Sequence, residues 1–75
     1  MPAKDPALKR FGDNVRARRE AQELSQEQLA DRADLDRTNI GGVEQGTRNI
    51  GVQNVPRTAH SLQFTTSELC VGIEQ

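Results

Sequence analysis

Two helix start signals stand close together in the middle of this chain, and they restrict it to a fold of short packed helices. Ser25 is a favoured residue just before a helix, and Gln28 follows it at the spacing of a capping box. Asp36 is a second such residue, and its side chain is expected to accept a hydrogen bond from the backbone N–H of Thr38 or Asn39. Apolar residues at helical spacing follow both signals, so we predict two consecutive helices here.

The connection between these two helices is short. The first of the pair is expected to end near Ala33, and residues 33–35 form a three-residue link. Ile40 and Val43 supply the apolar side of the next helix, and Gly46 is a natural residue to end it. Two helices joined this tightly, with a small alanine at the corner, are typical of a helix-turn-helix unit.

Helix signals also dominate before this unit. The first helix of the chain is predicted from about Ala7 to about Ala21, with Pro6 in its first turn. Its apolar stripe consists of Leu8, Phe11 and Val15. Gly12 inside this helix either weakens it slightly or lets another backbone approach closely.

Two further helices are predicted after the unit. The apolar face of the fourth helix consists of Val52, Val55, Ala59 and Leu62. Pro56 falls inside this pattern, so the regular helix either begins near Val55, with the proline at its first position, or is kinked there. The fifth helix begins at Thr65, and Glu68 completes a second capping box. The apolar residues of the fifth helix are Leu69, Cys70 and Ile73.

The chain has 75 residues, which allows one domain at most. We therefore assign residues 1–75 to a single all-helical domain, with a flexible N-terminus over residues 1–6. No apolar run approaches the roughly 20 residues of a membrane span. The N-terminus also lacks the apolar stretch of a secretory signal. We expect a cytoplasmic protein with no membrane partner.

The residue types argue against a catalytic or metal site. A single cysteine, Cys70, excludes an internal disulfide framework, and a single histidine, His60, leaves no metal cluster. Gly41, Gly42 and Gly46 lack the Lys-Ser/Thr pair that a phosphate-binding P-loop requires. We expect no enzyme activity, no cofactor and no metal.

The net charge of −1 argues against binding to a polyanion, but the charges are unevenly distributed. Residues 1–20 carry six basic and three acidic residues, whereas residues 21–44 carry six acidic and two basic residues. Local patches, and not the sum, create the field that a polyanion meets. On charge alone we favour a solvated basic helix followed by a solvated acidic one over a nucleic-acid site.

Short motifs in a fixed order suggest a family. Residues 24–30 (LSQEQLA) resemble the second-helix signature of the Cro/repressor or XRE family, and residues 44–46 (EQG) match the end of its third helix. Residues 11–69 as a whole resemble this family. The resemblance implies an all-α, five-helix, lambda-repressor-like DNA-binding domain with the helix-turn-helix at helices 2 and 3. It also implies a structural ion pair between Arg19 and Glu44, which ties the first helix to the third.

Residues 35–40 (LDRTNI) and 44–49 (EQGTRN) are similar to the controller proteins of bacterial restriction–modification systems. This narrower resemblance implies a homodimeric, sequence-specific transcriptional regulator that binds paired half-sites in double-stranded operator DNA. RNA polymerase is a further partner for such a role. The alternatives are a phage-type repressor and an antitoxin-like module of the same fold, whose acidic stretch over residues 20–36 would meet a basic protein.

In this fold the third helix enters the major groove and presents its N-terminal residues to base edges. Arg37 is expected to donate to guanine O6 and N7, Thr38 to meet a phosphate or thymine, and Asn39 to read adenine. Arg48 and Asn49 are placed by the resemblance near the DNA backbone or minor groove. The complete predicted DNA-binding set is Gln26, Arg37, Thr38, Asn39, Gly41, Gly42, Arg48 and Asn49.

Several of these residues also have a purely structural interpretation. Thr38 and Asn39 would help to cap the third helix, and Arg48 would neutralise the C-terminal end of that helix. Two adjacent glycines destabilise a helix interior by about 2 kcal/mol relative to alanine. Gly41 and Gly42 therefore imply either a soft recognition helix or one whose backbone approaches the DNA closely. The basic side chains of the first helix are expected to be solvated: Arg10, Arg16 and Arg18.

A second copy of the chain is the expected protein partner, because one domain of this size reads only one half-site. The interface is expected at the C-terminal helices, with Phe64, Leu69 and Ile73 as its residues. Leu69, like Leu62, has an alternative place in the core of the single chain.

Overall fold

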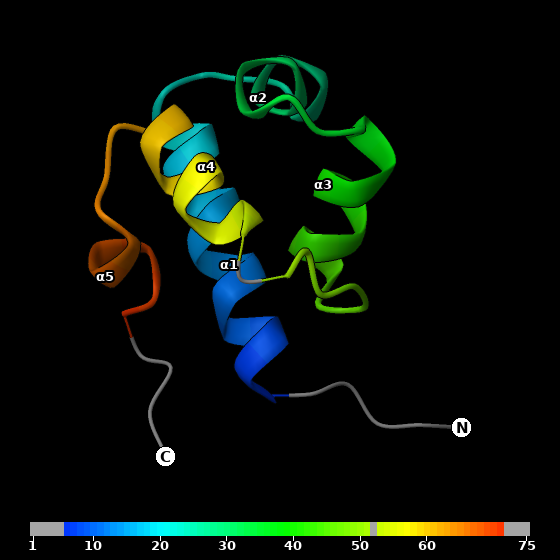
Figure 1. The fold of residues 1–75 in the computed structure, drawn as a ribbon, viewed down its shortest axis with the longest axis vertical. Coiled ribbons are helices and arrows are strands. Elements are labelled where there is room, and N and C mark those ends of the chain that lie inside the picture. The colour runs from blue at the N-terminus through cyan, green and yellow to red at the C-terminus, as the bar shows by residue number, and fades with distance from the viewer. Residues whose placement is uncertain (1–5, 52, 72–75) are drawn as a thin grey trace.

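The computed structural model describes residues 6–51 and 53–71, and within these ranges every regular element is an α-helix. The helices in chain order are α1 (Pro6–Ala21), α2 (Gln26–Ala33), α3 (Arg37–Gln45), α4 (Asn54–Ser61) and α5 (Thr66–Leu69). Figure 1 shows α1 in the middle of the molecule, with α2 and α3 toward one side and α5 on the other. The predicted all-α, five-helix architecture is confirmed.

Both predicted capping boxes are present. The Ser25 hydroxyl accepts from the Gln28 N–H at 3.0 Å, and the Gln28 side chain accepts from the Ser25 N–H at 2.8 Å. Thr65 and Glu68 repeat this exchange at the start of α5. The hydrogen bond from the Thr65 backbone N–H holds the pKa of the Glu68 carboxyl below its ordinary value. These local bonds explain why α2 and α5 begin where the sequence predicts.

The core is aliphatic and lies between the apolar faces of the helices. Helix α1 packs against α3 and α5, α2 packs against α3 and α4, and α4 packs against α5. The largest fully buried apolar side chains are Leu29, Ile40, Leu62, Leu69, Val15 and Val43. This packing buries one face of α3 and leaves the opposite face exposed.

Gly12 marks the point where α1 and α3 meet. A Cβ atom built on Gly12 would lie 2.0 Å from the carbonyl oxygen of Val43, so no side chain fits at this crossing. Of the two interpretations of this glycine, the close backbone approach is the correct one. The crossing sets the orientation of α3 relative to the rest of the molecule.

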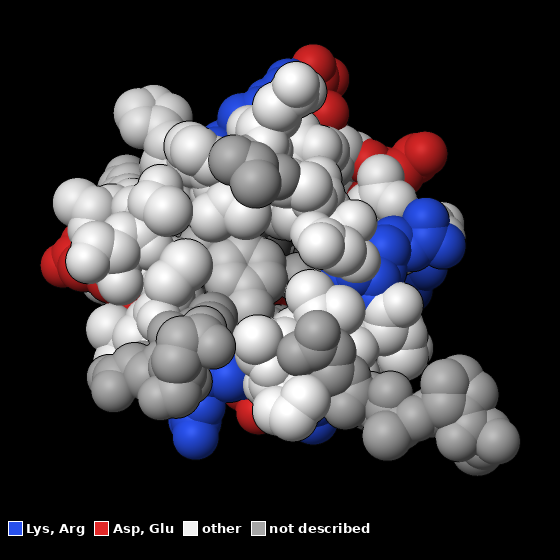
Figure 2. All heavy atoms as spheres, turned by 60° about the horizontal axis from the view of Figure 1, so that its bottom comes forward, with Lys and Arg blue, Asp and Glu red and all other residues white. Residues whose placement is uncertain are grey.

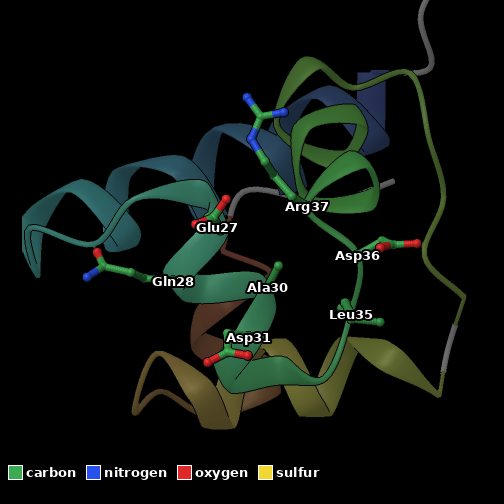
Figure 3. Close-up of a pocket in the computed structure, with 7 residues that line it drawn as sticks. All are labelled: Glu27, Gln28, Ala30, Asp31, Leu35, Asp36 and Arg37. Atoms are coloured by element: carbon green, nitrogen blue, oxygen red, sulfur yellow. The ribbon is translucent and has the colours of Figure 1, made fainter.

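The predicted side-chain cap at Asp36 is wrong. Asp36 precedes α3 as expected, but its side chain makes no capping hydrogen bond. Its backbone carbonyl instead accepts from the N–H groups of Asn39 and Ile40, at 3.0 and 3.2 Å. The exposed carboxylate points away from α3 (Figure 3), where it keeps its hydration. The turn is shaped instead by Asp34, which ends α2 in the left-handed conformation with φ 57°.

Helix α4 begins one residue before the predicted start and continues without interruption through Pro56. Pro56 is the third residue of the helix, not the first. The first four N–H groups of a helix have no partner within it, so a proline at this position removes no helical hydrogen bond. Thr58, which is buried, donates from its hydroxyl to the carbonyl of Asn54 at 2.9 Å. Val52 lies outside the described residues.

The two ends of the chain also refine the predictions. Pro6 belongs to α1 and not to a flexible N-terminus, and residues 1–5 lie outside the described residues. At the other end, Leu69 is 0% exposed within the single chain, so its side chain is not available to a partner. It belongs to the core, as its alternative interpretation had it, and the interface assignment of Leu69 is wrong. Ile73 lies outside the described residues.

Candidate nucleic-acid interface

The exposed face of α3 borders an open hollow of about 350 Å³. Because Ile40, Val43 and Glu44 occupy the buried face of α3, residues four apart on the other side point outward. The hollow is lined by Gln26, Arg37, Thr38, Gly41, Gly42, Gln45, Thr47 and Arg48. None of these residues is acidic, and two are arginines, so the hollow offers a polyanion cations and hydrogen-bond donors without a carboxylate.

All but two of the predicted DNA-binding residues line this hollow. The exceptions are Asn39 and Asn49. The side-chain oxygen Oδ1 of Asn39 accepts a hydrogen bond from Arg48 Nη1 at 3.0 Å. The Asn49 side chain accepts from the backbone N–H of Gly51 at 2.8 Å and so closes a turn in the loop after α3.

Gln26 connects the exposed face of α3 to the interior. It is the first residue of α2 and lines the hollow, yet its side-chain amide also donates to Glu44 Oε1 at 3.1 Å. One of its two amide hydrogens is therefore engaged inside the protein, and the start of α2 is held against α3.

Arg19 and Glu44 form the ion pair that the resemblance implies. Arg19 Nε lies 2.6 Å from Glu44 Oε2, and Arg19 Nη2 donates to Glu44 Oε1 at 3.0 Å. The remaining guanidinium nitrogen donates to the carbonyl of Leu24 at 2.6 Å. The side chains are 12% and 3% exposed, and the bond to Glu44 raises the pKa of Arg19. Arg19 belongs to the last turn of α1 and Glu44 to the buried face of α3, so the pair links these two helices.

Two residues of the hollow were missed by the sequence prediction. Gln45 lies eight positions after Arg37 and thus on the same outward stripe of α3. The helical spacing of these two residues could therefore have predicted it. Thr47 is placed by the loop, where its hydroxyl donates to the carbonyl of Gly42 at 3.2 Å, and no sequence periodicity indicates it.

A second hollow of about 400 Å³ adjoins the first. It is lined by Lys9, Arg16, Arg19, Gln26, Glu44 and Gln45, so it shares Gln26 and Gln45 with the first hollow. Lys9 and Arg16 each pair with an acidic residue one turn further along α1, Asp13 and Glu20. The hydrogen bond from Lys9 holds the pKa of Asp13 below its ordinary value. Each of the three cations in this lining is thus paired with a carboxylate, because Arg19 pairs with Glu44.

A third hollow, of about 550 Å³, is larger than these two and also has Arg37 in its lining (Figure 3). It is lined by Glu27, Gln28, Ala30, Asp31, Leu35, Asp36 and Arg37. With three carboxylates and one guanidinium, it repels a polyanion. The volume of a hollow therefore does not single out the candidate nucleic-acid face, whereas the charge of its lining does.

Charge elsewhere is scattered. In Figure 2, which shows the lower side of the molecule of Figure 1, basic and acidic groups stand at the rim of a largely uncharged surface. The net charge of −1 thus consists of local contributions, and the smaller hollow beside α3 keeps its positive character.

Other kinds of site receive no support from residues 6–51 and 53–71. Within these ranges no group of three or more His, Cys, Asp or Glu side chains is placed to hold a metal ion. No helix among them is long and apolar enough to cross a membrane.

Known proteins resemble this chain in sequence and in fold. A helix-turn-helix family profile matches residues 15–69. The control protein C.MunI from Mycoplasma sp is 40% identical over 67 residues, which are 88% of this chain and 90% of that protein. The crystal structure of the restriction-modification controller protein C.AhdI from Aeromonas hydrophila is 44% identical, with a TM-score of 0.80 over 83% of this chain and 94% of that chain. The hypothetical transcription factor NHTF from Neisseria is 30% identical, with a TM-score of 0.84 over 95% and 82% of the two chains.

Proposed function

Because the chain belongs to the XRE-type helix-turn-helix family, we propose that it is a sequence-specific DNA-binding regulator of transcription, like the restriction-modification controller proteins that it resembles. In this proposal α3 enters the major groove of double-stranded operator DNA. The supporting observation is the 350 Å³ hollow, whose lining combines the start of α2, the exposed face of α3 and the following loop without an acidic residue.

Each residue of the hollow is expected to contact a different part of the DNA, according to its position. Arg37, at the first position of α3, is exposed and reaches base edges, where a guanidinium pairs bidentately with guanine. Thr38, Gln45 and Thr47 offer hydroxyl and amide groups to phosphates or bases. Few cations lie on this face, so we expect weak non-specific binding and a strong dependence of specific binding on each arginine.

A gel-shift titration with the DNA upstream of the protein's own gene tests this function. We expect wild-type binding that weakens as salt rises. Arg37→Ala should lose about 1–3 kcal/mol, or roughly 5-fold to 150-fold in affinity, because a bidentate base contact is removed. Arg32→Ala is the matched control, because it removes the same charge from an exposed position of α2 outside the hollow.

Two results would contradict the proposal. If the Arg37→Ala and Arg32→Ala proteins bind the DNA with equal affinity, the start of α3 is not part of the DNA interface. Absence of any binding at low salt would favour the alternative, an antitoxin-like module that binds a protein. For that alternative the acidic hollow beside α2, with Glu27, Asp31 and Asp36, is the surface suited to a basic partner.

The regulator is proposed to act as a homodimer on paired half-sites, since one α3 covers one half-site. Apolar groups at the C-terminal end of the described chain support this. Val71 is 60% exposed, and Phe64 and Cys70 are half-buried. Sedimentation at micromolar concentration should show a dimer, and a monomer throughout would contradict this part of the proposal.

Two further aspects follow from a role in transcription. RNA polymerase is proposed as a partner, and the acidic hollow is the face that remains accessible to it while the basic hollow contacts DNA. The proposed location is the cytoplasm, where the operator DNA lies. The proposed role is regulatory and not catalytic.

A further inference from the structure

The side chain of Arg48 folds back over α3 instead of extending from the loop that carries it. Arg48 follows the C-terminal end of α3, yet its Nη1 donates to Oδ1 of Asn39, near the start of that helix, at 3.0 Å. The guanidinium therefore lies over the first half of α3, beside the hollow that Arg37 also lines. One hydrogen bond to a neutral amide leaves four of its five N–H donors for other acceptors.

The absence of a side chain at position 42 makes this arrangement possible. A Cβ built on Gly42 would lie 2.9 Å from Arg48 Cβ, 3.1 Å from its Nε and 3.3 Å from its Cδ. The first of these atoms is the base of the arginine side chain, so an alanine would displace the whole side chain and not only its mobile tip. At Gly41 the same construction meets a single atom, Gln26 Oε1, at an ordinary 3.6 Å.

We propose that Gly42 and Asn39 are positioning residues that hold the Arg48 guanidinium on the DNA-facing side of α3, where Arg48 and Arg37 act together in sequence-specific recognition. This inference rests on the proposed function. It distinguishes the two adjacent glycines, because only Gly42 provides the space that Arg48 occupies.

Tethering has a physical consequence for recognition. A free arginine loses rotamer freedom when it binds, whereas one already held by Asn39 and by contact with Gly42 loses less. A guanidinium fixed over α3 can present its donors to a base edge in register with Arg37. A guanidinium on a loose loop would instead contact phosphates, without a strong preference for sequence. The ratio of affinities for operator and scrambled DNA distinguishes the two modes.

The test is a double-mutant cycle in operator affinity. We expect Arg48→Ala and Gly42→Ala each to weaken operator binding roughly tenfold or more, with much smaller losses on scrambled DNA. In the Arg48→Ala background, Gly42→Ala should cost less than about twofold, because the side chain that it displaces is already absent.

Gly41→Ala is the matched control in the same helix. Whatever its own effect on affinity, that effect should be the same within about twofold with and without Arg48. Equal coupling of Gly41 and Gly42 to Arg48, or additive losses for Gly42→Ala and Arg48→Ala, would overturn the proposal. Equal losses on operator and scrambled DNA would reduce Arg48 to a phosphate contact and would also overturn it.

A measurement on the free protein separates this proposal from the proposed function. The side-chain amide resonance of Asn39 should shift in the Arg48→Ala and Gly42→Ala proteins and stay in place in Gly41→Ala. An unchanged resonance in all three variants would contradict the positioning role even if the protein binds DNA. A wild-type chain that binds no DNA would contradict the proposed function, and with it the role of Arg48 in recognition.

Discussion

Two arginines contact α3 on opposite sides, and their hydrogen bonds to the helix differ in number and in burial. On the buried side, Arg19 is 12% exposed and makes two bonds to Glu44 and one to the carbonyl of Leu24. On the outer side, Arg48 is exposed and makes one bond to Asn39. The first guanidinium has its hydrogen-bonding capacity largely used within the protein, and the second keeps most of it for a ligand.

The difference separates stability from recognition on a helix of nine residues. Breaking a buried pair leaves a charge without a partner in a poorly solvated place, which destabilises the fold strongly. Breaking an exposed hydrogen bond changes folding little, because water replaces the lost partner. The two sides of α3 should therefore respond differently to mutation, and that expectation can be tested.

The largest expected effect is on the buried side. Glu44→Ala should lower the free energy of unfolding by about 3–5 kcal/mol, because Arg19 is left buried without its counter-ion. Urea or thermal unfolding measures this directly. The hydrogen bond to Glu44 raises the pKa of Arg19 above its ordinary value, so this contribution is fully present below that ordinary value and is lost only as the pH rises through the raised pKa. The loss should be the same at neutral and mildly alkaline pH.

Arg48→Ala is the control for the outer side. It should change the free energy of unfolding by no more than about 0.5 kcal/mol, as is usual for exposed positions. If Arg48→Ala destabilises the fold as much as Glu44→Ala, or if Glu44→Ala leaves the unfolding curve unchanged, the two sides of α3 do not differ as described.

A smaller effect is expected where the backbone of α3 meets α1. Gly12→Ala should destabilise the protein by about 1–3 kcal/mol, because its Cβ would fall 2.0 Å from the Val43 carbonyl oxygen and force the helices apart. Gly41→Ala, on the exposed face, should instead leave stability unchanged or raise it by up to about 1 kcal/mol. Chemical denaturation of both variants measures the two changes in the free energy of unfolding. Equal changes would contradict the conclusion that the crossing of α1 and α3 requires a glycine.

Local chemistry explains the parts of the fold that could be predicted. Ser25 with Gln28, and Thr65 with Glu68, are bonded through side chains only three residues apart, so no distant contact is needed to begin α2 and α5. Gly46 ends α3 in the left-handed conformation, with φ 75°, for the same local reason. Position within the helix likewise explains why Arg37 and Gly41 share an outward stripe.

The wrong predictions involve choices that local sequence leaves open. Asp36 is able to cap α3, but its exposed carboxylate stays hydrated and the backbone bonds alone begin the helix. Pro56 signals the first turn of a helix without deciding which of its positions the proline takes. Leu69 is apolar, and whether it covers its own core or a partner depends on how α5 docks. Asn14 fixes that docking through bonds to the carbonyls of Leu69 and Val71, at 2.8 and 2.7 Å.

The sequence by itself determined the helical class, the two capped helix starts, the tight connection between α2 and α3, and the family to which these motifs belong. Only the tertiary structure decided what the absence of a side chain does at the three glycines inside helices. Gly12 is a crossing point, Gly42 makes room for Arg48, and Gly41 does neither. A missing side chain carries no information about what fills its place, because the neighbour comes from a distant part of the chain or from a loop without periodicity. For the same reason the pairing of Arg48 with Asn39 became visible only in the folded molecule.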